Sequence, residues 1–173
     1  MRTTLGGTEG PAVDVFLPEV LRDQVVEFPE CSYGANRVTL LLADGRLVED
    51  VILAWGRQIV KVGGKPVASA EDLSFSTSDA VDVFPDSPAF GSNQEFFEAI
   101  AALAEQLDSR GLNAPADDIR TGLSCVNGLT DGWALLMESL FRVRAEFGSR
   151  LLAPEANALG AMALAAYRAV YRV

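Results

Sequence analysis

The sequence predicts an α+β protein in which a short helix and a small five-stranded antiparallel barrel precede a C-terminal four-helix bundle. Three observations support this prediction. Apolar residues alternate with a strand-like period before the segment Pro85-Asp86-Ser87-Pro88, and recur with helical spacing after it. The length of 173 residues suits one ordinary domain or two small ones. Hydrophobic residues make up 49% of the chain and charged residues 22%, which favours a folded protein.

The first half contains one helical pattern followed by five strand-like runs. Pro18 suits the first turn of a helix, and Leu21 and Val25 lie on its apolar stripe before Pro29 ends it. The Asp44-Gly45 pair is a strong signal for a two-residue hairpin, and glycines mark further turns at 56 and at 63–64. We expect strands over residues 37–43, 47–55, 58–62, 65–67 and 79–84.

This order of one helix and five short strands, over about residues 18–84, resembles the small open barrels of the SH3-like and Sm-like type. The resemblance rests on element order and on no diagnostic motif. It would imply RNA binding through loop residues, as in many Sm-like barrels. The aromatic side chains of this half are not interleaved with basic residues as an RNA surface requires, so we expect most of them to pack in the core. They include Tyr33, Trp55, Phe75 and Phe84.

The second half predicts four helices packed as an antiparallel bundle. The first begins with the capping-box pattern Ser92-Asn93-Gln94-Glu95 and ends near Gly111. The second begins at Pro115 and is broken by Asn127-Gly128. Pro154 is expected to begin the last helix, which is rich in alanine. Thr130 or Asp131 is expected to cap the third helix, one face of which is apolar. The stripe of the third helix comprises Leu129, Trp133, Leu136, Leu140 and Val143.

The predicted domain organisation has three parts. Residues 1–12 combine glycine, threonine and proline without periodicity, and are expected to form a flexible leader. Residues 13–86 form the barrel domain and residues 89–173 the helical bundle. Each part is small enough to leave apolar surface uncovered, so we expect the bundle to pack against the barrel.

The composition excludes several kinds of chemistry. The chain has no histidine, which removes the usual general base near neutral pH and the most common metal ligand. Cys31 and Cys125 are the only cysteines and have no C-x-x-C spacing, so we expect two buried, reduced thiols rather than a disulfide or a reactive cysteine. Glycine-rich phosphate-binding motifs are absent. We therefore predict no catalytic residues, no metal site and no cofactor.

The charge of the chain bears on its partners. The formal net charge is −10, of which −7 lies in residues 1–88, with 7 basic and 14 acidic residues, and −3 in the remainder. A negative surface repels phosphate backbones and anionic lipids, so neither nucleic acid nor membrane is expected as a partner. A basic protein is the partner that this charge favours, and simple solubility is the alternative explanation. The absence of a secretion signal and of a membrane span in the sequence favours a cytoplasmic location.

Two groups of residues are candidate partner-binding sites. The string from Cys125 to Trp133 places Asn127, Thr130, Asp131 and Trp133 at a helix junction, where rigid helices could present them to a partner. A turn, a helix cap and a core tryptophan explain the same residues structurally, and this explanation is favoured. Trp55 and Arg57 flank Gly56 at a strand corner, which is either an exposed recognition edge or the place of a buried, anchoring tryptophan; burial is favoured.

Carboxylate groups could support acid–base chemistry, but none has a catalytic or calcium-binding spacing. The groups considered are Glu49-Asp50, Asp79-Asp82-Asp86 and Asp117-Asp118. The leading hypothesis is therefore a non-enzymatic, acidic, bacterial-type protein-binding module that acts in the manner of an antitoxin or immunity protein. One alternative is an enzyme that uses carboxylate, tyrosine or lysine chemistry in a cleft between the two halves. A second alternative is a structural or assembly subunit. The oligomeric state is left open.

Overall fold

A computed structural model describes residues 15–87 and 89–173 of the chain, and divides them into two compact units. The first unit holds residues 15–26 and 30–83, and the second holds residues 27–29 with the chain from Phe84 to Val173. The division falls between Val83 and Phe84, inside the last strand and a little before the change of hydrophobic rhythm. The predicted leader over residues 1–12 lies outside the described residues.

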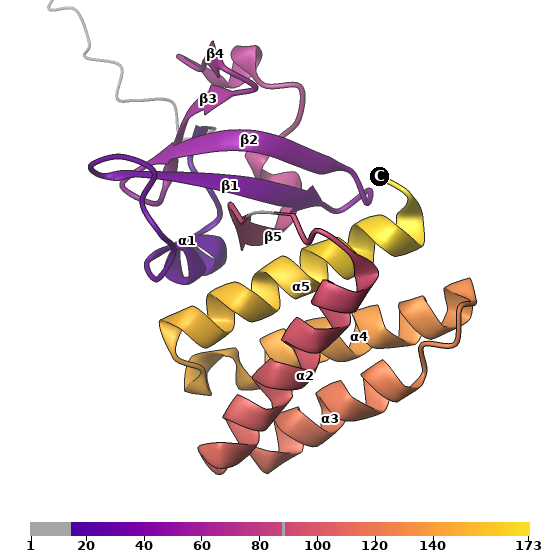
Figure 1. Ribbon diagram of the computed structural model, residues 1–173. Helices are drawn as coiled ribbons and strands as arrows, with labels where there is room; N and C mark the ends of the chain where they lie inside the picture. The colour runs from indigo at the N-terminus through magenta and orange to yellow at the C-terminus, as the bar shows by residue number, and fades with distance from the viewer. Residues whose placement is uncertain (1–14, 88) are drawn as a thin grey trace, which may run out of the picture. The chain divides into compact units, whose positions relative to one another are not determined.

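The first unit is a five-stranded antiparallel sheet with one short helix (Figure 1). The elements are α1 (Glu19–Val25), β1 (Ala35–Leu42), β2 (Leu47–Ala54), β3 (Gln58–Val62), β4 (Lys65–Pro66) and β5 (Ala80–Pro85). The strand order is β4-β3-β2-β1-β5, so the strands form a meander to which β5 returns beside β1. Helix α1 begins after Pro18, as the sequence predicts.

The sheet is not closed into a barrel, which corrects the prediction of a small five-stranded SH3-like or Sm-like barrel. Strands β4 and β5 stand at opposite ends of the strand order. Strand β4 is only two residues long, and one of the two, Pro66, has no backbone N–H to donate to a ladder. The predicted range of this strand is 65–67, and the Val67 N–H still donates to the Val60 carbonyl of β3 at 2.9 Å.

The hairpin between β1 and β2 forms where Asp44-Gly45 predicts it, but with a longer loop. The Gly45 N–H donates to the Leu42 carbonyl at 2.9 Å, and the Leu42 N–H donates to the Arg46 carbonyl at 2.9 Å. Gly45 has a φ of 87°, which glycine adopts without strain. This pattern is a three-residue loop with a bulge rather than the two-residue turn expected. The Asp44 carboxylate accepts from the Arg46 N–H at 3.0 Å and fixes the loop.

The core of the first unit lies between the sheet and α1. Leu21 and Val25 of α1 are buried, and so are the residues that alternate along the central strands. Burial of each such aliphatic side chain contributes about 1.5–3 kcal/mol relative to exposure. The fully buried strand residues include Val38, Leu40, Val51, Leu53, Ile59 and Val83.

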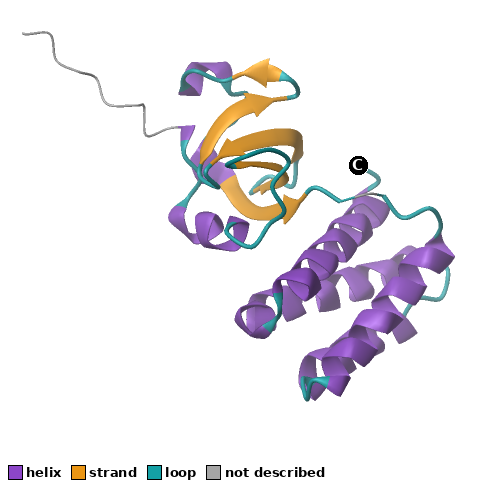
Figure 2. Cartoon of the chain, turned by 60° about the vertical axis from the view of Figure 1, so that its left-hand side comes forward, coloured by secondary structure: helices purple, strands orange, loops and turns teal. Residues whose placement is uncertain are grey.

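The second unit consists of four helices packed together (Figure 2). They are α2 (Asn93–Ser109), α3 (Asn113–Ser124), α4 (Thr130–Phe147) and α5 (Ala153–Tyr171). Each helix lies against the next, and α5 also lies against α2, so that the four form a closed ring of neighbours. Their buried faces follow the predicted stripes; Ile100, Leu136, Leu140, Val143 and Leu159 are fully buried. Leu129 is the exception, because it is exposed just before α4.

The two predicted helix caps differ in outcome. The Ser92 hydroxyl oxygen accepts from the Glu95 N–H at 3.1 Å, as predicted, while the Glu95 carboxylate returns to the Gly91 N–H at 2.7 Å rather than to that of Ser92. Thr130 and Asp131 do not occupy the cap position of α4: Leu129 does, and its side chain makes no capping hydrogen bond. Among the described residues, no helix is both long enough and apolar enough to span a membrane.

Candidate functional site

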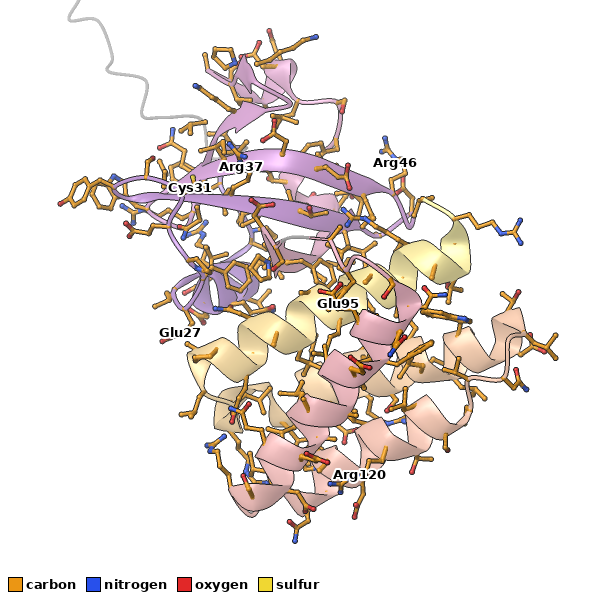
Figure 3. The ribbon with its side chains drawn as sticks, viewed as in Figure 1. Glu27, Cys31, Arg37, Arg46, Glu95 and Arg120 are labelled. Atoms are coloured by element: carbon orange, nitrogen blue, oxygen red, sulfur yellow. The ribbon has the colours of Figure 1, made fainter. Side chains whose placement is uncertain are left out.

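Two tight turns of the first unit come together because β1 and β2 are paired. Ala35 lies opposite Ala54 in the ladder, so the turn that enters β1 adjoins the turn that leaves β2. The Trp55 N–H donates to the Gly34 carbonyl at 2.7 Å and extends the pairing by one residue. Figure 3 labels Cys31 and Arg37, which precede and follow the first of these turns. We call Tyr33, Gly34, Trp55 and Gly56 the aromatic corner.

The turn that enters β1 presents Tyr33 to solvent. The Ala35 N–H donates to the Ser32 carbonyl at 2.9 Å, which places Tyr33 and Gly34 at the two central positions. Gly34 has a φ of 66°, the left-handed value that the second central residue of a type II turn requires. The Tyr33 side chain is 91% exposed. A turn of this geometry therefore holds an aromatic ring almost entirely in water.

The turn that leaves β2 has an unusual central residue. The Arg57 N–H donates to the Ala54 carbonyl at 3.2 Å, and Trp55 and Gly56 have φ values of 54° and 68°. Two positive φ values are the combination of a type I′ turn, for which asparagine and glycine are the favoured residues. Tryptophan is a poor choice here, because its Cβ crowds the backbone at a cost of about 1–2 kcal/mol. The sequence thus tolerates local strain to place an indole at this point.

The two rings of the aromatic corner contact each other edge to face. The centroids of Tyr33 and Trp55 are 5.5 Å apart and the ring planes are 87° apart. A Cβ atom added to Gly34 would lie 2.8 Å from the Trp55 ring, so the absence of a side chain at Gly34 makes room for the indole. Trp55 is nevertheless 63% exposed. The prediction that Trp55 is buried and anchors the sheet is wrong.

Charged groups border the aromatic corner. One Glu30 carboxylate oxygen accepts from the Gly34 N–H at 3.2 Å, which places this acid beside the turn. Arg37 and Asp50 form an ion pair at 3.3 Å across β1 and β2, with both side chains about half exposed. Arg57, the second residue predicted at this corner, is exposed. The corner therefore combines two exposed aromatic rings with one carboxylate at hydrogen-bonding distance from its backbone.

The second predicted group lies at the junction of α3 and α4 in the other unit. Asn127, Thr130 and Asp131 are exposed, and the Asn127 side-chain oxygen accepts from the Leu129 N–H at 3.1 Å. Trp133 is half buried, because its ring stacks on Phe96 at 5.5 Å with planes 13° apart. The junction thus forms a turn whose tryptophan packs within the helical unit. Among the described residues of this junction, no residue other than glycine has a positive φ.

One carboxylate of the helical unit, that of Asp118, joins two helices. Asp118 on α3 accepts from Arg142 Nε and Nη2 on α4 at 2.8 and 2.7 Å, and from the Ser139 hydroxyl at 2.9 Å. The Arg142 hydrogen bonds hold the pKa of Asp118 below its usual value, with Ser139 helping and partial burial opposing. A carboxylate with a lowered pKa and occupied oxygens is a weak general base. This cluster connects helices, and its geometry favours no reaction.

A second carboxylate, Glu155, is buried at the start of α5. It accepts from Arg110, from Gln106 Nε2 at 3.3 Å and from the Leu152 N–H at 2.8 Å. These bonds satisfy its charge and tie α5 to the end of α2. Among residues 15–87 and 89–173, no three acidic or cysteine side chains gather as metal ligands would.

Two expectations about individual residues need correction. Tyr33 was grouped with the core aromatics, but it is exposed, whereas Phe75 and Phe84 are buried as expected. The turn residue Gly34 directly after Tyr33 was the signal in the sequence that could have placed Tyr33 at a turn tip. Cys31 is exposed and Cys125 half buried, so neither is the buried thiol that was predicted. Both are unbonded.

Comparison of this chain with protein-family models, with characterised proteins and with solved structures finds no match.

Proposed function

We propose that this chain is a non-enzymatic protein-binding module, and that the aromatic corner is its contact surface. The observation that carries this proposal is Trp55, a bulky residue held exposed in a left-handed turn position. Backbone strain of this kind is typical of functional positions, since the surrounding structure must maintain it. Tryptophan and tyrosine are also the residues most enriched among the dominant contacts of protein interfaces. The two observations favour the same surface independently.

The acidity of the chain narrows the kind of partner. With a net charge of −10, the chain attracts a basic protein and speeds its association. An antitoxin or immunity protein, which neutralises a partner by covering it, is the type of module that we propose. In this proposal the sheet unit, whose element order resembles SH3-like and Sm-like barrels, presents the aromatic corner.

The proposal is tested by copurification from the native cell, followed by identification and reconstitution of the partner. The dissociation constant of the reconstituted complex is then measured for the wild type and for Trp55→Asn, which suits the turn backbone. We expect at least 30-fold weaker binding, as is usual for a central interface aromatic. Leu129→Ser is the matched control, because Leu129 is also 63% exposed and lies beside the second predicted group.

Three other results would contradict the proposal. If Leu129→Ser weakens binding and Trp55→Asn does not, the contact surface lies at the α3–α4 junction. A purified chain that forms a defined oligomer, and loses it in Trp55→Asn, would make this chain an assembly subunit. Repeated recovery of the chain without a partner, at low salt as well as at physiological salt, would remove the basis for a binding module.

A further inference from the structure

The chemistry of the aromatic corner specifies the group that it would bind. The Tyr33 and Trp55 rings are perpendicular, and both residues are largely exposed to solvent. The face of an aromatic ring carries partial negative charge and attracts cations, most strongly for tryptophan. An uncharged aliphatic group would gain contact area at this surface but would leave that attraction unused.

A carboxylate lies on the same surface. Glu30 Oε2 accepts from the Gly34 N–H at 3.2 Å, which leaves Oε1 available to a second donor. The same Gly34 lies against the Trp55 ring, since an added Cβ would come within 3.0 Å of three of its ring carbons. The carboxylate and the indole therefore both lie beside Gly34. An aromatic face beside a carboxylate matches a planar cation that stacks and donates hydrogen bonds at once.

We propose that the aromatic corner binds an arginine side chain of a basic segment of the partner protein. The guanidinium group stacks on the exposed Trp55 ring and donates to Glu30. This inference rests on the proposed function and specifies its partner chemistry. Charge complementarity supports it, because residues 1–88 carry a net charge of −7. Arginine fits better than lysine, since its planar group stacks on rings and presents a rigid fork of donors. Arg57 is the like charge nearest to Trp55 in the sequence, and should oppose binding.

The two tryptophans of the chain make a direct test possible. In the Trp133→Phe variant, Trp55 is the sole tryptophan, and its emission reports on the aromatic corner. The variant is titrated with a tetra-arginine peptide and with the tetra-citrulline peptide, which has the same planar shape without charge. We expect a saturable change of Trp55 emission with the arginine peptide and at least tenfold weaker binding of the citrulline peptide. A tetra-lysine peptide should bind more weakly than the arginine peptide.

Charge variants distinguish a local site from general attraction to an acidic protein. Glu30→Gln should weaken binding of the arginine peptide about fivefold or more, whereas Glu71→Gln, which removes an equal charge from another exposed position of the same unit, should change it less than twofold. Arg57→Gln should strengthen binding. Equal effects of Glu30→Gln and Glu71→Gln, equal binding of the citrulline peptide, or no response of Trp55 at millimolar peptide would each overturn the inference.

The natural complex separates a failure of this inference from a failure of the proposed function. If the identified partner binds through Trp55 but tolerates replacement of each of its interface arginines by glutamine, the aromatic corner is a contact surface for a different side chain. If Trp55→Asn leaves partner binding unchanged, both the contact surface and its arginine ligand are wrong. If one arginine of the partner and Trp55 are coupled in a double-mutant cycle, both are supported.

Discussion

The backbone of Trp55 leads to a prediction about stability that needs no partner. Trp55→Ala and Trp55→Asn remove the same ring, and with it the contact to Tyr33, which is worth about 0.5–1.5 kcal/mol beyond its buried area. The two variants differ mainly in how well the new residue tolerates the φ of 54°. Asparagine visits the left-handed region readily, whereas a residue such as alanine pays roughly 1–2 kcal/mol there. Trp55→Asn should therefore be more stable than Trp55→Ala by about 1 kcal/mol.

This difference can be measured by hydrogen exchange of the slowest β1 and β2 amides, which open when the sheet unfolds. About 1 kcal/mol corresponds to roughly fivefold slower exchange in the asparagine variant. Tyr33 provides the control, because it is also an exposed aromatic residue but does not have a positive φ. Tyr33→Asn and Tyr33→Ala should differ by less than about 0.5 kcal/mol. An alanine variant as stable as the asparagine variant at position 55 would refute the argument from strain.

Three further predictions concern close contacts and charge. Gly34→Ala should destabilise the first unit by about 1–3 kcal/mol and shift the fluorescence emission of Trp55. The φ of position 34 is 66°, and the new Cβ would lie 2.8 Å from the indole. Unchanged emission and unchanged thermal unfolding would contradict this prediction. Gly122→Ala should lower the free energy of unfolding, because the new Cβ would lie 2.7 Å from the Cβ of Ser139. This clash should outweigh the ~1 kcal/mol by which alanine favours a helix over glycine. A raised melting temperature would show that α3 and α4 can move apart to make room. Asp118→Asn should cost on the order of 1 kcal/mol at pH 7, given its half-exposed arginine partner. Because the pKa of Asp118 is lowered on folding, this difference is present above about pH 4 and is lost as the pH falls through the folded pKa. A difference in urea titrations that does not shrink as the pH is lowered below about 4 would contradict the ionic origin.

Much of the fold could be predicted from the sequence, because local signals and burial agree there. Ser92 begins α2 as its cap pattern indicates, and the glycine pair at 63–64 turns the chain between β3 and β4. Closure of the sheet could not be predicted, since it depends on how many ladder bonds the last strands make. Pro66 lies in β4, at one end of the strand order, and the local sequence there does not indicate whether β4 meets β5 at the other end.

The candidate site was only half visible in the sequence. The sequence indicates Trp55 and Arg57 as candidates, because an aromatic and a basic residue flank a glycine at a strand end. The hydrophobicity of tryptophan favours its burial. In the structure Trp55 is exposed, because it occupies a central position of a tight turn. Tyr33 was missed because its proximity to Trp55 follows from strand register: Ala35 pairs with Ala54, and no sequence signal announces that pairing.

The last strand, β5, is shared between the two units, and this affects how the chain can be divided. Val83 is buried with the sheet, whereas the neighbouring Phe84 belongs to the helical unit, where its ring lies 5.9 Å from that of Phe141 and 4.4 Å from the Arg144 guanidinium carbon. A helical fragment that starts at residue 89 would lack this side chain, and loss of a buried phenylalanine costs about 3–5 kcal/mol. A fragment that starts at residue 84 keeps the ring but shortens the sheet's edge strand. A cut after Pro85 therefore removes Phe84 from the helical unit, whereas a cut between Val83 and Phe84 divides β5.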